Sequence, residues 1–127
     1  MIQKNTILKV SDNSGAKTVK CIQVLGGFKK KNAKLGDIIV VSIQQLKSNK
    51  TKNNLKVKKK EVYRALIIRT KIGYSKKNGF REFFFENSVI LINKQNNPIG
   101  TRILGPVPKI LKKKTLQKFL SISSAII

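Results

Sequence analysis

Histidine and tryptophan are absent from this chain of 127 residues, and cysteine occurs once, as Cys21. Without histidine, no serine, threonine or cysteine has the base that usually activates it near neutral pH. A single cysteine cannot form an internal disulfide, and a zinc site would need further ligands from scattered carboxylates. We therefore expect a core position for Cys21, and neither catalysis nor a bound metal or cofactor.

Acidic residues are also scarce, with five against 28 lysines and arginines, for a formal net charge of +23. Asp12 and Asp37 occupy positions typical of a turn and of a strand start. Only Glu82 and Glu86 lie close together in the sequence. On one strand they would share a face and could hold a hard cation, but two solvated acids among lysines are the simpler interpretation. A metal-dependent nuclease, the enzyme alternative, would need more carboxylates.

Long hydrophobic runs are missing as well. The longest apolar stretches span a few residues, whereas a membrane helix needs about 20. Residues 1–10 are typical of folded sequence, so we expect no leader peptide. The length and the hydrophobic content of 40% predict one domain, residues 1–127, with a single modest core.

Lysine is the residue that the chain has in excess, with 24 copies beside four arginines. This charge predicts a polyanionic partner, and nucleic acid is favoured because each neutralised phosphate releases counterions. A membrane is the rival, but it favours one basic amphipathic helix, and these lysines form separate clusters. The clusters are Lys29–Lys31, Lys47–Lys60, Lys76–Lys77 and Lys112–Lys114. Lysine, isoleucine and asparagine all have A/T-rich codons, so part of the excess reflects coding.

Short apolar segments between turn signals predict a mainly β fold, either a barrel or a sandwich. The expected strands are residues 7–10, 17–25, 37–43, 61–70, 81–85 and 89–92. The turn signals are Asp12–Gly15 and Asn78–Gly79, and the second predicts a hairpin that begins near Gly73. Residues 38–41 are all apolar, which indicates a strand buried on both faces. In the second strand, we expect Gln23 to share a face with Val19 and Cys21.

Two further segments differ from this pattern. Residues 44–60 are expected to form a loop with a polar insertion at 47–55, which is either mobile or an extension that orders on RNA. We expect the barrel to cover about residues 1–105 and a tail to cover about residues 106–127. The tail is expected to be helical from Pro108 onward. Its apolar side chains would pack on the barrel, namely Ile110, Leu111, Leu116, Phe119 and Leu120.

A set of segments follows in order along the chain, namely Met1–Gln3, Leu8–Lys17, Cys21–Gly27, Gly36–Val41, Lys56–Lys59, Ala65–Lys71 and Gly100–Val107. Together these segments resemble the L-fourteen family of large-subunit ribosomal proteins. The signature block of that family is met by Ala65–Ile68, Asn78–Gly79, Phe84, Asn87 and Ile90–Leu91. The chain departs from the family in the insertion, at Lys60 where glycine is common, and in the last five residues. It also departs at residues 109–114, where every charged side chain is basic.

The resemblance implies a small closed five-stranded β-barrel with a projecting hairpin and short C-terminal helices. It also implies a structural constituent of the large ribosomal subunit that binds rRNA near the intersubunit face and supports assembly and translation. Implied partners are large-subunit rRNA, proteins of the L-three and L-nineteen families, small-subunit rRNA and a ribosome-silencing factor. A free-standing OB-type RNA-binding module or RNA chaperone is the alternative function. The A/T-rich coding and the divergent insertion favour a mitochondrial, organelle-encoded protein, with the plastid and the bacterial cytoplasm as alternatives.

We expect rRNA contacts from basic side chains, namely Lys17, Lys20, Lys29, Lys30, Lys31, Lys56, Lys58, Lys59, Lys60, Arg69, Lys71, Lys76 and Lys77. Arg69 and Arg102 stand out, because an arginine kept in a lysine-rich chain indicates a bidentate or stacked contact. Arg102 could instead bind carbonyl groups of the tail helix. The resemblance implies a protein or factor contact at Thr101, Arg102 and Lys118. The hairpin phenylalanines at 80 and 83–85 are expected mainly to pack in the core or hairpin, with base stacking as the alternative.

Overall fold

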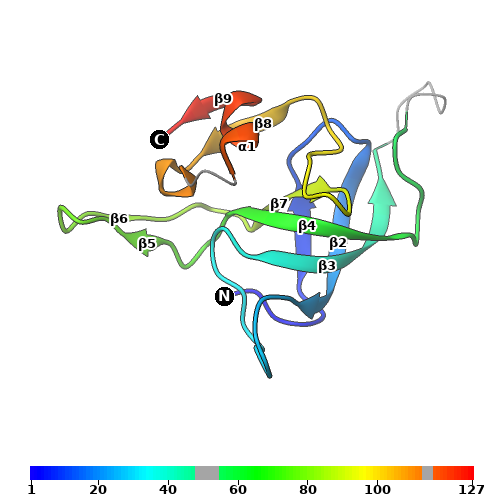
Figure 1. The fold of residues 1–127 in the computed structure, drawn as a ribbon, viewed down its shortest axis with the longest axis horizontal. Helices are drawn as coiled ribbons and strands as arrows, with labels where there is room; N and C mark the ends of the chain where they lie inside the picture. Colours follow the sequence, from blue (N-terminus) through cyan, green and yellow to red (C-terminus); the bar gives the residue numbers. More distant parts are fainter. Residues whose placement is uncertain (48–54, 113–115) are drawn as a thin grey trace.

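A computed structural model describes residues 1–47, 55–112 and 116–127 of the chain. Five strands close into a barrel in the order β1-β2-β3-β4-β7 (Figure 1). β1 and β7 pair in parallel, and the other neighbours are antiparallel. Their bounds are β1 Ile7–Val10, β2 Ala16–Val24, β3 Ile38–Leu46, β4 Val62–Arg69 and β7 Ser88–Ile92. The predicted mainly β fold with a closed five-stranded barrel is confirmed.

Two apolar clusters lie on opposite faces of β4. Ala65 and Ile67 face the barrel interior, while Leu66 and Ile68 face a second cluster outside the barrel. All four side chains are fully buried. The continuous apolar run of this strand therefore reflects burial on both sides, because an outer layer of chain covers it.

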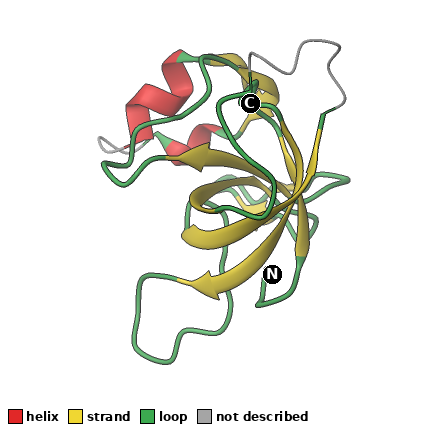
Figure 2. Cartoon of the chain, turned by 90° about the vertical axis from the view of Figure 1, so that its right-hand side faces the viewer, coloured by secondary structure: helices red, strands yellow, loops and turns green. Residues whose placement is uncertain are grey.

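The outer layer consists of a second small sheet and two short helical segments (Figure 2). Its parts are β8 Ile103–Val107, the 3₁₀ helix η2 Lys109–Leu111, the helix α1 Gln117–Ser121 and β9 Ser123–Ile126. β8 and β9 pair in parallel, so the tail is only partly helical, and the sequence reasoning missed both strands.

The packing of this tail follows the expectation at four of five positions. Leu111 and Phe119 are buried, and Leu116 and Leu120 pack partly buried against the outer cluster. Ile110 was expected to pack with them, but it is 51% exposed. The short 3₁₀ turn aims Leu111 inward, and its neighbour then faces outward.

Burial on both faces was wrongly expected for residues 38–41. Ile39 and Val41 are buried, but Ile38 and Val40 are only partly so. The outer cluster is built on buried residues of β4, β7 and the tail, and from β3 only Ile38 packs against it. In β2 a register irregularity between Cys21 and Gln23 turns Gln23 to solvent, and Val24 becomes buried in place of the expected Gln23.

The predicted hairpin consists of β5 Tyr74–Ser75 and β6 Arg81–Glu82, and it extends well beyond the barrel (Figure 1). β6 ends at Glu82, three residues before the expected end of that strand. β3 in turn continues to Leu46, because Gln45 and Leu46 pair with β2. The expected loop therefore starts later, and most of the polar insertion, residues 48–54, lies outside the described residues.

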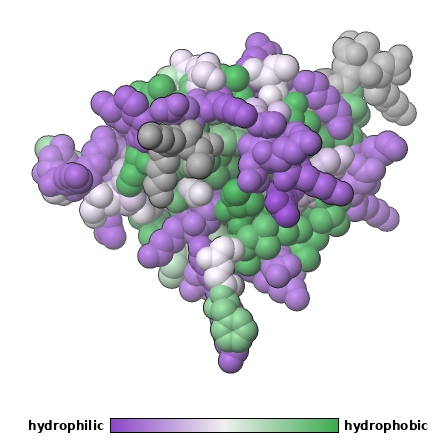
Figure 3. Space-filling view, viewed as in Figure 1, coloured by the Kyte–Doolittle hydropathy of each residue, from purple (hydrophilic) through white to green (hydrophobic). Residues whose placement is uncertain are grey.

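Hydrophilic side chains cover most of the face seen in Figure 3, with smaller apolar areas between them. None of the helices in the described ranges is long and apolar enough to cross a membrane.

Candidate nucleic-acid interface

The first lysine cluster lies on the loop between β2 and β3. Lys29 and Lys31 are exposed, whereas Lys30 is half-buried and its Nζ lies 2.8 Å from Asp37 Oδ2. Asp37 also accepts the backbone N–H of Lys34 at 2.9 Å, so the carboxylate braces the end of the loop as expected. The loop thus holds its two outer lysines in solvent on an anchored backbone.

A second cluster lies just before β4. Lys56, Lys58, Lys59 and Lys60 are exposed, and Val57 between them is 2% exposed. Lys60 has a φ of +66°, a left-handed conformation that explains why a glycine would also suit this position. The buried valine anchors the segment, so the flanking ammonium groups project outward.

The remaining predicted lysines lie on β2 and on the hairpin. Lys17 is exposed and Lys20 half-exposed on β2, while Lys71 and Lys77 are exposed at the base and near the tip of the hairpin. Lys76 forms an ion pair with Glu82 across the hairpin. Figure 1 shows the hairpin, the β2–β3 loop and the segment before β4 extending from different sides of the barrel. The predicted cations therefore surround the barrel, and they do not form a single patch.

Few of these cations meet an acid within the described ranges. The ion pairs there are Lys9–Glu86, Lys30–Asp37, Arg69–Glu86 and Lys76–Glu82. Most of the positive charge is therefore uncompensated by the protein, and it is available to an anionic partner.

Glu82 and Glu86 do not form the cation site that their spacing allowed. Glu82 binds Lys76 and accepts the hydroxyl of Tyr74, and these bonds lower its pKa. Burial, and then the Glu82 contact, raises the pKa of Tyr74. Glu86 binds Lys9 at 2.7 Å, which lowers the pKa of its carboxyl group. The described residues contain no group of three potential metal ligands.

Arg69 is 8% exposed and serves an internal contact. Its Nη2 donates to the carbonyl of Leu104 at 2.7 Å, and its Nη1 lies 3.6 Å from Glu86. Burial lowers its pKa and Glu86 opposes this, but a guanidinium group remains charged at neutral pH. The arginine thus ties β4 to β8, a role that the sequence reasoning missed.

The predicted protein contact surface is shaped by a residue that the sequence reasoning used only as a turn former. Asn13 Oδ1 accepts the backbone N–H groups of Thr101 at 2.7 Å and Arg102 at 3.3 Å. Asn13 Nδ2 also donates to Thr101 Oγ1 at 2.6 Å. Gly100 lets these two loop segments approach, because a Cβ there would lie 2.8 Å from Asn13 Oδ1. Asn13 therefore holds the backbone of residues 101 and 102 in place.

Arg102 and Lys118 are both exposed. Lys118 Nζ donates to Asn97 Oδ1 at 2.8 Å. Among the described residues, no hydrogen bond from the Arg102 guanidinium to a tail carbonyl is present, so the structure does not support the anchoring interpretation.

The hairpin phenylalanines pack less than expected. Phe80, Phe83 and Phe85 are 70%, 61% and 92% exposed, and only Phe84 is partly buried. The packing expectation is therefore wrong for three of the four, because β6 ends early and no layer of the described chain covers this edge. Cys21, by contrast, is fully buried as predicted, and burial raises the pKa of its thiol.

In a comparison with protein families, the family described as ribosomal protein L14p/L23e matches residues 1–127 of this chain. The match therefore includes the barrel, the hairpin and the tail together.

Proposed function

We propose, from the premise that this chain belongs to the ribosomal protein L14p/L23e family, that its separate lysine clusters bind large-subunit rRNA. Membership of this family gives the chain a structural role in the large ribosomal subunit. The members of this family are structural proteins and not enzymes. It also implies location on the ribosome and contact with rRNA and other ribosomal proteins.

Exposed lysines on three projections carry this proposal. The β2–β3 loop, the segment before β4 and the hairpin leave the barrel on different sides, and each bears cations without an acidic partner among the described residues. Such a distribution suits RNA that folds around the protein, since each projection reaches a different stretch of backbone. The contacting residues are Lys17, Lys20, Lys29, Lys30, Lys31, Lys56, Lys58, Lys59, Lys60, Lys71, Lys76 and Lys77.

Arg69 has a different part in this proposal. Its guanidinium is buried against Leu104 and Glu86, so Arg69 positions β8. In this proposal the lysines, and not Arg69, contact the phosphates. A loss of RNA affinity on its replacement would then follow from a displaced β8.

A protein-facing surface is proposed at Thr101, Arg102 and Lys118. The Asn13 hydrogen bonds hold the backbone of the first two rigidly, and a preorganised arginine loses little freedom on binding. The partners that we propose are proteins of the L-three and L-nineteen families, a ribosome-silencing factor and, across the subunit interface, small-subunit rRNA. The proposed compartment is the mitochondrion, with the plastid and the bacterial cytoplasm as alternatives.

The experiment is co-sedimentation of the tagged chain with large ribosomal subunits after a high-salt wash. Stable, near-stoichiometric retention is expected, because rRNA and protein contacts together resist the wash. A closed five-stranded barrel is also the architecture of OB-type modules, so a free-standing RNA-binding role is the second candidate. Complete release into the unbound fraction, with RNA binding retained, would favour that second candidate.

A further inference from the structure

The exposed phenylalanines of the hairpin form a feature that electrostatic binding of rRNA does not explain. From residue 81 to residue 86, exposed and partly buried side chains alternate. Arg81, Phe83 and Phe85 are exposed, while Glu82 and Phe84 are partly buried. The extended chain thus places one guanidinium and two aromatic rings on the same outward face.

The two rings on this face are ordered relative to each other. Phe83 and Phe85 lie with ring centroids 6.1 Å apart and planes at 86°, an edge-to-face pair. Such pairs are favourable, so each ring restrains the other although both are exposed. Phe85 is 92% exposed and is therefore almost fully available for a further contact.

A shallow hollow of about 280 Å³ adjoins this face. Arg81, Glu82, Phe83, Phe84 and Ile127 line it. The lining combines flat and apolar side chains with the guanidinium group of Arg81, a donor, and this combination suits contact with a nucleobase.

The charges around the rings favour nucleic acid over an apolar protein surface. Glu82 is bound to Lys76 and Tyr74, and Glu86 to Lys9, so both acids of this segment are neutralised internally. Arg81, in contrast, has no acidic partner among the described residues.

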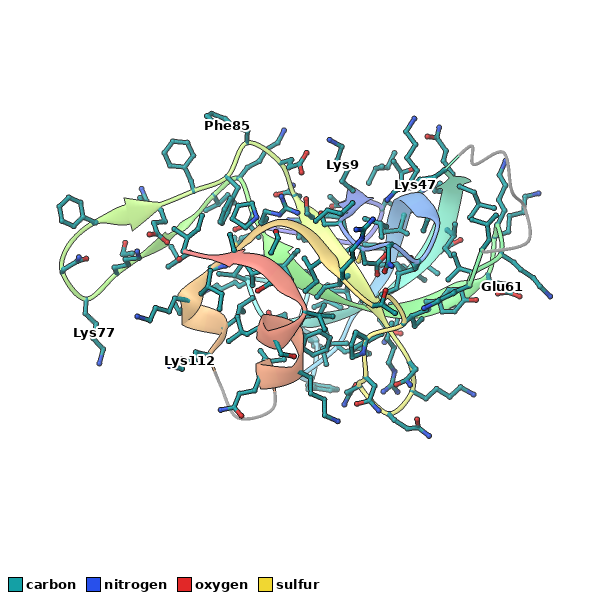
Figure 4. The ribbon with its side chains drawn as sticks, turned by 90° about the horizontal axis from the view of Figure 1, so that it is seen from above. Lys9, Lys47, Glu61, Lys77, Phe85 and Lys112 are labelled. Carbon is teal, nitrogen blue, oxygen red and sulfur yellow. The ribbon has the colours of Figure 1, made fainter. Side chains whose placement is uncertain are left out.

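Figure 4 shows Phe85 and Lys77 pointing to opposite sides of the hairpin. RNA that encloses the projection would meet rings on one side and an ammonium group on the other. An apolar protein partner would instead have to bury the charge of Arg81 beside the two rings, which is costly.

We infer that Phe83 and Phe85, with Arg81 beside them, form a stacking platform for unpaired nucleobases of RNA. This inference rests on the proposed rRNA binding and adds the chemical class of the ligand. The lysine clusters contact phosphates of any RNA, whereas the rings require bases that are not enclosed in a double helix. Phe80, 70% exposed near the hairpin tip, provides a further ring on the same projection.

The test compares a short oligouridine strand with a blunt-ended RNA duplex of equal nucleotide number, using the full chain. The double variant Phe83→Leu, Phe85→Leu keeps apolar bulk but removes the flat rings. We expect its affinity for oligouridine to fall about tenfold and its affinity for the duplex to stay unchanged. The matched control is Val62→Leu, a change at a 60% exposed apolar residue on the barrel, which should alter neither affinity.

Fluorescence gives an independent measurement of stacking. The chain contains no tryptophan, so Phe85→Trp introduces a single reporter, and Val62→Trp gives a control reporter. Oligouridine should quench the first reporter and leave the second unchanged, whereas the duplex should quench neither.

Three results would overturn the inference, and they are distinguishable. Unchanged oligouridine affinity in the leucine variant with an unquenched Trp reporter excludes stacking but leaves lysine-driven rRNA binding intact. A wild-type chain that binds neither RNA contradicts both the inference and the proposed function. A leucine variant that binds both RNAs normally but no longer joins large subunits shows that the rings face a protein.

Discussion

The buried carboxylate of Asp12 accepts the backbone N–H of Leu91 at 3.0 Å, a contact between residues 79 positions apart. The other oxygen of the same carboxylate accepts the backbone N–H of Ser14 at 3.0 Å and the Ser14 hydroxyl at 2.5 Å. One side chain therefore shapes the turn after β1 and also attaches that turn to β7. This is the seam where β1 and β7 pair in parallel to close the barrel.

Replacement of Asp12 by alanine should destabilise the barrel. Asp12 is 1% exposed, so the variant would leave the N–H of Leu91 and the donors of Ser14 without their acceptor in a dry environment. We expect a loss of about 3 kcal/mol in the free energy of unfolding, measured by urea denaturation.

Asp37→Ala is the matched control for this variant. Asp37 also accepts a backbone N–H in a turn, but its side chain is 29% exposed and water can replace it. Its loss should cost about 1 kcal/mol. Equal losses in the two variants would contradict a special role for the barrel seam.

Arg69→Met should destabilise the contact between barrel and tail. Methionine fills a similar volume but cannot donate to the Leu104 carbonyl, and Glu86 loses one of its two cations. We expect a loss of about 1–3 kcal/mol by urea denaturation, with the tail becoming more sensitive to protease. A variant with wild-type stability and reduced RNA affinity would instead indicate a direct RNA contact by Arg69.

The ion pair of Glu86 predicts a specific dependence of stability on pH. The hydrogen bond from Lys9 lowers the pKa of Glu86 in the folded chain, and Ser88 and Arg69 add to this. A carboxyl group with a lowered folded pKa stabilises the protein above its ordinary pKa, and the contribution disappears as the pH falls through the lowered value.

Glu86→Gln should therefore be less stable than wild type near neutral pH, and the difference should vanish in acid. The side chains of both partners are partly in solvent, so we expect a difference of less than about 1 kcal/mol. Thermal melts of both chains across the acidic range measure it. A difference that grows toward acidic pH would contradict the assignment.

Lys58→Gln with Lys59→Gln should reduce the salt dependence of RNA binding. Both lysines are exposed beside the buried Val57. Each phosphate contact adds roughly 0.7–0.9 to the slope of log affinity against log salt, so the slope should fall by about 1.5. The control Lys58→Arg with Lys59→Arg keeps both charges and should keep the slope. A slope that does not change in the glutamine variant would exclude this pair from the interface.

Arg102→Ala should weaken incorporation or silencing-factor docking more than Lys112→Ala does. The backbone of Arg102 is held by Asn13, whereas Lys112 is an exposed lysine in a run of three. Loss of a positioned arginine costs about 1–3 kcal/mol in binding, and loss of one lysine among several should cost less. Occupancy in purified large subunits, with a thermal melt to confirm folding, makes the comparison.

Much of the fold was predictable because its signals are local. The barrel strands coincide with apolar segments, and the hairpin follows from the Asn78–Gly79 turn signal, because such turn residues act through their own backbone. Cys21 and Asp12 also occupy their expected core and turn positions. Where these predictions failed, the errors concerned the ends of strands, such as the continuation of β3 to Leu46, and the burial of single side chains, such as Ile38 and Gln23.

The candidate site was predictable only in part. Exposure of the lysines at 29, 31, 56 and 58–60 follows from their charge, because an unpaired ammonium group is costly to bury. Phe85 is exposed although its side chain is apolar, and Arg69 is buried although its side chain is charged. Both outcomes depend on which segments of chain lie next to the residue, and hydropathy carries no such information.

The sequence by itself determined the strand segments of the barrel, the turns and a charge that favours an anionic partner. The tertiary structure decided which faces are covered: β8 and β9 pair in parallel across the tail, and β8, η2 and α1 bury the outer side of β4. It also decided that Arg69 serves β8 and that Asp12 closes the barrel. The physical reason is that each of these contacts joins residues far apart in the chain, so their partners exist only after the barrel has formed.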